Sequence, residues 1–246
     1  MDSINKILIL LLVLIIGFSG YYSEYSLKSS SVLESLYQPL SSPQILCSTD
    51  YGYVARAGPY GNKSSKFKVA YIVGVHPMEL NSHTAIILVM NNQKNSMKYC
   101  YYIYAVKVTR NASNYNDGRI NGQKLAYNYA LPDIMAKNIT LVIDVHSNHG
   151  FYKEKRFISV PVHDITSESI AFQIINKVAW LVFYIPPTER GPTSGPFVTI
   201  PLIKSGISAF VYETYIYEPY ETTLKHAKDF INAVDQTNLD GSIKGV

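Results

Sequence analysis

Apolar runs of strand length alternate with amphipathic segments of helix length from residue 67 to the end of the chain. Runs rich in Val, Ile, Tyr and Phe predict strands, and apolar positions three and four apart predict helices. The predicted strands cover 67–75, 99–108, 141–145 and 207–212, and the predicted helices cover 79–91, 167–180 and a final segment after Pro219. This alternation is typical of βαβ units and predicts an α/β layer fold.

The first 44 residues do not follow this pattern. Lys6 precedes a charge-free apolar run at 7–18, which has the length of a secretory signal core rather than the ~20 residues of a spanning helix. We therefore expect 1–20 to be a signal peptide or membrane anchor, with cleavage left open. Residues 21–44 are rich in Ser, Tyr and Pro and predict a linker. The remaining residues, 45–246, are expected to form one domain.

Composition excludes several classes of protein. The 246 residues are 47% hydrophobic and 16% charged, which fits one core with an appendage and argues against disorder. The net charge of +4 comes without any block of like charges, so we expect no nucleic-acid partner. Cys47 and Cys100 are too far apart for a CxxC motif, and they form either one disulfide or two separate thiols.

Two histidines stand at the carboxyl ends of predicted strands, where open α/β sheets bind ligands. His76 ends the first strand, and Glu79 lies one turn later, so imidazole and carboxylate can converge. His146 shares a strand face with Asp144 because side chains alternate with period two. Two imidazoles, one carboxylate and a water form an open zinc site of the hydrolytic kind. Asp144 is a candidate to orient one of these imidazoles.

A hydrolytic zinc site needs a general base for its water. Glu213 ends the apolar strand at 207–212 and is our candidate. His83, four residues after Glu79, and His149, in the loop after the second histidine strand, are weaker candidates for the metal or the substrate. Ser194 lacks the Gly-x-Ser-x-Gly spacing of a nucleophile elbow. The sequence also contains no P-loop, dinucleotide fingerprint or HExxH motif.

The HxxE motif, the Asp-x-His motif and the late strand that ends in Glu together resemble the zinc metallocarboxypeptidases, in particular the compact branch that contains succinylglutamate desuccinylase and aspartoacylase. The resemblance covers about 67–215. It implies an α/β fold with a mixed, largely parallel sheet flanked by helices on both faces, and a catalytic domain within 45–246. It also implies that His76, Glu79 and His146 bind Zn²⁺, and that Glu213 promotes attack of water on an amide.

The same family uses arginines between these motifs to hold the substrate carboxylate and the oxyanion. Here the interval contains Arg110 and Arg119, and a guanidinium pairs bidentately with a carboxylate. We prefer Arg119 as the catalytic and substrate-binding residue. Asn121 and Tyr215, one of several tyrosines around Glu213, are further substrate-binding candidates.

These features predict an exported zinc-dependent amide hydrolase, secreted or anchored to the outer face of the membrane. The preferred function is a metallocarboxypeptidase that acts on cell-surface or cell-wall peptides. An N-acyl amino acid deacylase of the desuccinylase/aspartoacylase type is the first alternative, and in both cases the substrate carries a carboxylate. A non-catalytic cell-surface binding or adhesive protein is the second alternative.

Overall fold

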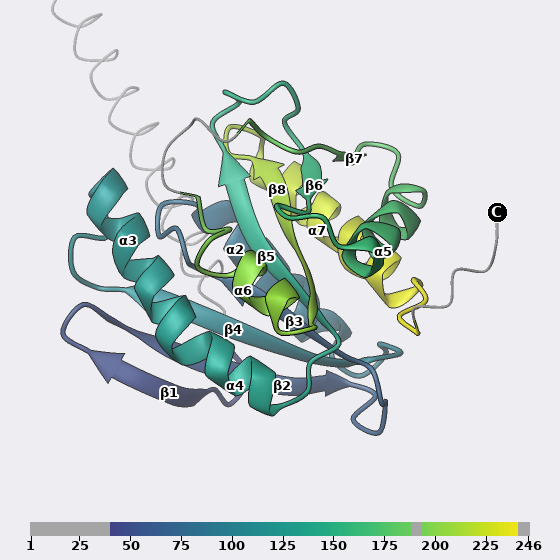
Figure 1. Cartoon of the computed structure of the whole chain (residues 1–246), viewed down its shortest axis with the longest axis horizontal. Coiled ribbons are helices and arrows are strands. Elements are labelled where there is room, and N and C mark those ends of the chain that lie inside the picture. The colour runs from purple at the N-terminus through teal and green to yellow at the C-terminus, as the bar shows by residue number, and fades with distance from the viewer. Residues whose placement is uncertain (1–39, 188–192, 241–246) are drawn as a thin grey trace, which may run out of the picture. The chain divides into compact units, whose positions relative to one another are not determined.

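The alternating pattern builds a single eight-stranded sheet in the residues that the computed structural model describes, 40–187 and 193–240 (Figure 1). The strands are β1 (Gln44–Thr49), β2 (Gly52–Gly61), β3 (Lys68–Val73), β4 (Cys100–Val108), β5 (Leu141–Asn148), β6 (Phe157–Ser159), β7 (Val182–Phe183) and β8 (Ser208–Tyr215). Their order in the sheet is β1-β2-β4-β3-β5-β8-β6-β7. Strands β4, β3, β5 and β8 are parallel, and β2 and β6 run antiparallel to β4 and β8 at the two sides of this core. At the edges, β1 runs antiparallel to β2 and β7 runs parallel to β6.

Helices cover both faces of this sheet. The first face packs against α2 (Leu80–Gln93), α5 (Ile165–Ile175) and α7 (Tyr220–Asp235). The second face packs against α3 (Tyr115–Leu125), the π-helical turn η1 (Ala126–Ala130), α4 (Leu131–Ala136) and α6 (Thr199–Lys204). The mixed, largely parallel sheet with helices on both faces confirms the predicted fold class.

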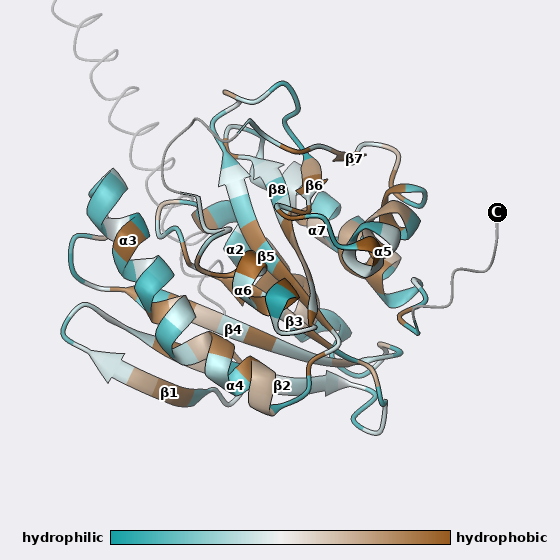
Figure 2. Cartoon of the chain, in the orientation of Figure 1, coloured by the Kyte–Doolittle hydropathy of each residue, from teal (hydrophilic) through white to brown (hydrophobic). Residues whose placement is uncertain are grey.

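Alternate side chains of strand β5 face the two opposite cores of the sheet. Leu141, Ile143 and Val145 belong to the core under α2 and α7, whereas Val142 belongs to the core under α3 and α6. Because side chains alternate, Asp144 and His146 share the second face with Val142. Apolar residues occupy the first part of β5 and polar residues follow toward its carboxyl end (Figure 2). The polar groups are thus gathered at one end of one face.

The four predicted strands and the helices near 79–91, 167–180 and after Pro219 are present as β3, β4, β5, β8, α2, α5 and α7. Two strands are longer than predicted, because the β5–β8 ladder continues to the pair Asn148 and Tyr215. His146 and Glu213 therefore lie within strands rather than after them.

The predicted signal peptide or anchor at 1–20 lies outside the described residues, as does most of the predicted linker at 21–44. Strand β1 begins at Gln44, the last residue of the predicted linker. Within 40–187 and 193–240, no helix combines the length and the apolar character needed to cross a bilayer. Cys47 and Cys100 are both free thiols.

Candidate active site

The strand order reverses between β3 and β5, which is the topological switch point of the sheet. The chain passes from β3 through α2 to β4 on one side, and then through α3, η1 and α4 to β5 on the other side of β3. Ligands bind in open α/β sheets outside the carboxyl ends of strands at such a switch point. His76 follows β3, and His146 lies near the end of β5. The topology therefore brings the two histidine motifs to adjacent positions.

The turn after β3 places His76 and Glu79. Gly74 has φ +88°, and a Cβ at this position would lie 2.0 Å from the carbonyl oxygen of Val106. Only glycine allows this close approach to β4 with that backbone conformation. The amide of Glu79 then donates to the carbonyl oxygen of His76 at 3.1 Å, which closes the turn just before α2. Imidazole and carboxylate consequently face the same point.

Glu79 joins the two imidazoles directly. Its Oε1 lies 3.0 Å from His76 Nδ1, and its Oε2 lies 2.9 Å from His146 Nδ1. The three candidate ligand atoms lie within 4.8 Å of one another, and all three residues are buried. The backbone amide of Ser147 also donates to Glu79 Oε2 at 2.9 Å. The structure thus brings the three sequence-predicted metal ligands together.

The pKa values of His76 and His146 are shifted in opposite directions. Burial lowers the pKa of His76 to about 4, so its imidazole is neutral near pH 7. Burial also opposes the charge on His146, but Asp144 and Glu79 outweigh it and raise the pKa of His146 well above its usual value. His146 Nε2 lies 3.0 Å from Asp144 Oδ2. Although burial disfavours the charge on Glu79, the two imidazoles hold its pKa well below the usual range.

Arg119 reaches this cluster from α3. Its Nη2 donates to Glu79 Oε1 at 2.7 Å, and its Nη1 lies 2.8 Å from His76 Nδ1. The guanidinium also lies 4.5 Å from the centre of the Tyr115 ring, one helical turn earlier. Asn114 starts α3 by accepting hydrogen bonds from the amides of residues 116 and 117. Arg119 therefore points toward the candidate metal ligands.

Glu213 faces the same site from the neighbouring strand. It is the register partner of His146 in the parallel β5–β8 pair, so the two side chains lie on the same face. Asn148 Nδ2 lies 3.4 Å from Glu213 Oε2. Burial raises the pKa of Glu213 to about 8, against the opposing charge of His146. This carboxyl group is poised to exchange a proton near neutral pH.

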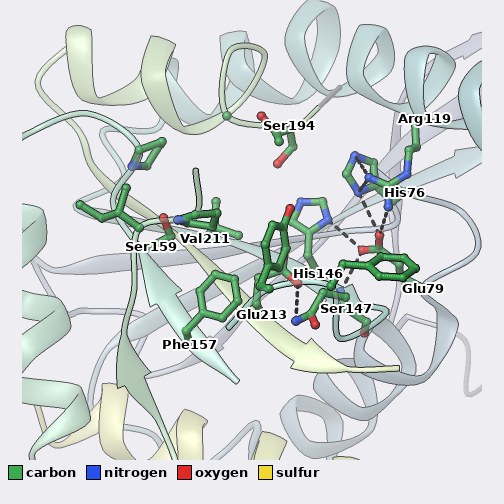
Figure 3. Close-up of a pocket in the computed structure, with 18 of the residues that line it drawn as sticks. His76, Glu79, Arg119, His146, Ser147, Phe157, Ser159, Ser194, Val211 and Glu213 are labelled. Carbon is green, nitrogen blue, oxygen red and sulfur yellow. Dashed lines mark hydrogen bonds and ion pairs between the residues drawn. The ribbon is translucent and has the colours of Figure 1, made fainter. Parts of the chain in front are cut away.

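All five groups open into one cavity of about 700 Å³. Figure 3 shows Arg119, His76 and Glu79 on one side of Glu213, with Phe157, Val211 and Ser159 on the other. The wall of this cavity also contains aromatic, aliphatic and hydroxyl side chains, among them Tyr115, Phe151, Tyr152, Ile185, Ser194, Phe197 and Ile200. The cavity is large enough for a small peptide or an acylated amino acid.

The other sequence candidates lie outside the cavity, with the exception of His149. Asn121 donates its side-chain amide to the carbonyl oxygen of Arg110, and neither Asn121 nor Tyr215 lines the cavity. Arg110 pairs with Asp50 on the surface at 2.5 Å. His83 lies 3.1 Å from the carbonyl oxygen of Val145 and is buried. His149 lines the cavity, with its Nδ1 2.9 Å from the hydroxyl of Tyr217.

Two side chains at the site were not predicted from the sequence in these positions. Tyr152 lines the cavity, and Glu213 and Arg119 are among the charges that act on its phenol. Ser194 donates to Asp144 Oδ2 at 2.6 Å and is 3% exposed. Both residues lie on irregular segments without periodicity. No sequence motif marks Tyr152. Ser194 resembles only an incomplete nucleophile elbow in the sequence, which does not predict its contact with Asp144.

The chemistry of this cluster fits a divalent metal ion. It offers two imidazole nitrogens and a carboxylate, the ligand types of open zinc sites. One imidazole has a buried carboxylate at its other nitrogen, as metal-bound histidines usually do. His76, Glu79 and His146 are therefore able to hold such an ion.

No protein-family model matches the sequence, and no curated protein matches it. Solved structures do share its fold. A metallo-carboxypeptidase from Pseudomonas aeruginosa, in complex with (2-guanidinoethylmercapto)succinic acid, aligns with a TM-score of 0.54 at 10% identity, over 85% of this chain and 67% of that one. A succinylglutamate desuccinylase/aspartoacylase from Rhodobacter sphaeroides aligns with a TM-score of 0.50 at 13% identity, over 79% of this chain and 62% of that one. The chain thus has a metallocarboxypeptidase-like fold, as the resemblance implied.

Proposed function

We propose that this protein is a zinc-dependent amide hydrolase, with carboxypeptidase action on peptides as its preferred reaction. One observation carries the proposal: three buried ligand atoms within 4.8 Å of one another share a cavity with a carboxyl group whose pKa is raised to about 8. A structural role for the cluster does not require the adjoining cavity. Titratable groups with perturbed pKa values in a cavity are typical of catalytic sites.

His76, Glu79 and His146 would hold the ion. Bound zinc polarises a carbonyl group and lowers the pKa of a water molecule. His76 is already neutral, as a ligating imidazole must be, whereas His146 has to release its proton. The buried carboxylate of Asp144 beside His146 Nε2 keeps that ring in one orientation.

Glu213 is the proposed general base. A positive charge nearby favours its carboxylate form, in which it takes a proton from water. It then carries that proton to the nitrogen that leaves when the amide bond breaks. Its place on β8, in register with His146, supports this transfer because both side chains face the cavity. The phenol of Tyr152 lines the same space and is a candidate donor to the substrate.

Arg119 is the proposed partner of the oxyanion. Its guanidinium already contacts the carboxylate of Glu79 and the ring of His76, which is next to the position of a polarised carbonyl group. Donors fixed in a buried site stabilise charge that develops during the reaction. Among the described residues that line the cavity it is the sole arginine, so we assign it this role in preference to binding a distant substrate carboxylate.

The substrate class is proposed to be a peptide or acyl-amino acid with a carboxylate. The Pseudomonas protein of the same fold was solved with a succinic acid derivative, which supports a carboxylate-bearing substrate. We keep deacylation as the alternative, because a desuccinylase/aspartoacylase shares the fold. Export, with a signal peptide or outer-face anchor, is proposed from the apolar run at 7–18, and it favours cell-surface or cell-wall peptides.

Hydrolysis by a Glu213→Gln variant tests this function. Loss of a general base typically lowers the rate 10²–10⁴-fold, so we expect kcat to fall by about that factor while bound zinc is unchanged. The assay compares blocked dipeptides, which report carboxypeptidase action, with N-acetyl amino acids, which report deacylation. Glu221→Gln, at an exposed position in α7, is the matched control. Equal hydrolysis by wild type and Glu213→Gln would contradict the proposal and favour the non-catalytic alternative.

A further inference from the structure

Three buried hydroxyl groups lie next to the candidate site residues along the chain. Ser82, Ser147 and Thr214 are each no more than 2% exposed. The two strand residues directly follow the second histidine ligand and the candidate base, and because side chains alternate they face the opposite side of the sheet. Earlier positions on that side, Val145 and Tyr212, belong to the apolar core under α2 and α7. The hydroxyl groups therefore stand where the pattern of both strands would place apolar side chains.

Hydrogen bonds join these groups into what we name the hydroxyl network. The hydroxyl of Ser147 donates to Ser82 Oγ at 2.9 Å and lies 2.8 Å from Thr214 Oγ1. Because Ser147 has a single hydroxyl proton, Thr214 is the donor in the second contact. Ser82 donates in turn to the carbonyl oxygen of Glu79 at 3.0 Å. Thr214 also reaches the carbonyl oxygen of His146 at 3.3 Å. The hydroxyl network thus connects the backbone of two candidate metal ligands.

The hydroxyl network crosses the three elements that present the site. Ser82 is on α2, Ser147 on β5 and Thr214 on β8. The last two are register partners, and they directly follow the pair His146 and Glu213 in the β5–β8 ladder. Only one further pair of residues separates them from the end of this ladder. Because elements open most easily at their ends, the network holds both strands and the helix together where ligand and base are presented.

Stability alone does not require hydroxyl groups at these three positions. Replacing both partners of a buried hydrogen bond by apolar groups of the same shape is nearly neutral for stability. A fully satisfied polar network differs from apolar packing because its directional bonds rigidify the surroundings and specify one arrangement. All three hydroxyl groups have such partners. The arrangement that they specify is the placement of the residues beside them.

We infer that Ser82, Ser147 and Thr214 are positioning residues that hold the candidate metal ligands and the candidate base at a fixed separation. This inference rests on the proposed function. Neither Ser82 nor Thr214 lines the cavity, so both act through their neighbours, Glu79 and Glu213. Precise placement matters at such a site, because a displacement of about 1 Å can lower a rate by about 10²-fold.

Two substitutions of Thr214 test the side of the network that holds the base. Thr214→Val keeps the shape of the side chain without its hydroxyl, whereas Thr214→Ser keeps the hydroxyl. With zinc supplied in excess, Thr214→Val should lower kcat by about 10-fold, part of the loss that misplacement can cause. KM should be unchanged, because Thr214 does not line the cavity. Thr214→Ser should restore kcat, which a general loss of packing would not explain.

The zinc Kd of Ser82→Ala tests the side that holds the ligands, and it needs no turnover. Ser82 acts through the backbone of Glu79, so we expect a loss of about 3- to 10-fold, below or at the lower end of the range for direct partners of a ligand. Competition with a chromogenic chelator measures it. Ser96→Ala is the matched control, because Ser96 also donates to the carbonyl oxygen three residues earlier, but beyond the other end of α2. It should bind zinc like wild type.

Ser147→Ala removes the middle hydroxyl and should show both losses, so it replaces any variant that thermal unfolding shows to be unfolded. Equal kcat values for Thr214→Val and Thr214→Ser would overturn the inference, as would equal zinc Kd values for Ser82→Ala and Ser96→Ala. Failure of the proposed function has a different signature. A wild-type protein that hydrolyses none of the substrates contradicts the hydrolase, whereas weaker zinc binding by Ser82→Ala alone would still support the positioning of the ligands.

Discussion

Glu79 is the residue on which the candidate metal centre depends. It is 2% exposed, yet both of its oxygens are used, one by His76 and Arg119 and the other by His146 and the amide of Ser147. A buried carboxylate is tolerated only when it is paired and hydrogen-bonded in this way. The same contacts fix the carboxylate between the two imidazoles, where a metal ligand is needed.

Ser194 should matter through Asp144 rather than as a nucleophile. Ser194→Ala removes the hydrogen bond to Asp144, and that carboxylate lies beside His146. Loss of a direct partner of a metal-bound histidine typically weakens metal binding about 10- to 100-fold, and Ser194 acts one contact further out, so we expect a loss of about 10-fold at most. We expect that loss in the zinc Kd, measured by competition with a chromogenic chelator. Thr193→Ala, at the exposed neighbouring position, should bind zinc like wild type. Equal affinities for both variants would refute the positioning role.

Residue types and spacing were enough to predict the candidate ligands. His76 and Glu79 are three positions apart, and His146 stands on a strongly apolar strand, so each has a local signal. Tyr152 and Ser194 have none, because their roles depend on contacts between irregular segments and distant strands. Asn121 was predicted from the resemblance, as a substrate-binding residue between the two histidine motifs, but on α3 its side chain donates to the carbonyl oxygen of Arg110.

At the scale of elements, α3 is held against the turn that carries His76. Gly122 lies so close to this turn that a Cβ would be 2.0 Å from the carbonyl oxygen of Val75. No side chain fits there without moving the helix. Because Arg119 lies one turn earlier on α3, this contact also sets how far its guanidinium reaches toward Glu79.

Gly122→Ala should therefore destabilise the protein. Overpacking of this kind typically costs about 1–3 kcal/mol, and we expect at least that loss in the free energy of unfolding, measured with urea. Lys124→Ala makes an alanine at an exposed position of the same helix and should stay within about 0.5 kcal/mol of wild type. Equal stability of the two variants would contradict the close packing of α3 on the turn.

Helix α2 and strand β5 meet through His83, whose contact with the carbonyl oxygen of Val145 is buried. Burial lowers the pKa of His83 from 6.5 to about 4. As pH falls through this window the unfolded chain binds the proton first, so folding stability decreases. The shift corresponds to a loss on the order of 3 kcal/mol by pH 4.

His83→Gln keeps a donor for this carbonyl group but does not titrate. Relative to wild type, the variant should gain stability between pH 7 and pH 4, as measured by urea unfolding at each pH. The neighbouring Glu79, His76 and His146 are common to both proteins. His163→Gln removes an exposed histidine and is the control, expected to change the pH dependence far less. Parallel stability curves for wild type and His83→Gln would show that His83 is not a buried neutral imidazole.

Elements with a strong local pattern were predictable and the others were not. Strands β3, β4, β5 and β8 lie in the middle of the sheet and read as continuous apolar runs. Strand β2 was missed because it contains glycines and a proline, and β6 and β7 because they are only three and two residues long. Helix α3 was missed because its exposed face makes it strongly polar.

At the scale of the whole molecule, the fold explains why distant motifs meet. The order of strands places β3 beside β5 and β5 beside β8, so residues near 76, 146 and 213 reach one end of one sheet face. The resemblance could imply the fold class from three motifs, since parallel strands end at the same edge. It could not predict the cavity wall, which is built from loops whose course depends on tertiary packing.

The zinc content of the purified protein tests the central claim most directly. Elemental analysis of the full chain, purified without chelators, should give one zinc per chain. Glu79→Gln removes the central carboxylate and should reduce this ratio to near zero, whereas Glu221→Gln should leave it at one. A wild-type protein without zinc, or a Glu79→Gln variant that retains it fully, would contradict the metal centre and with it the proposed hydrolase.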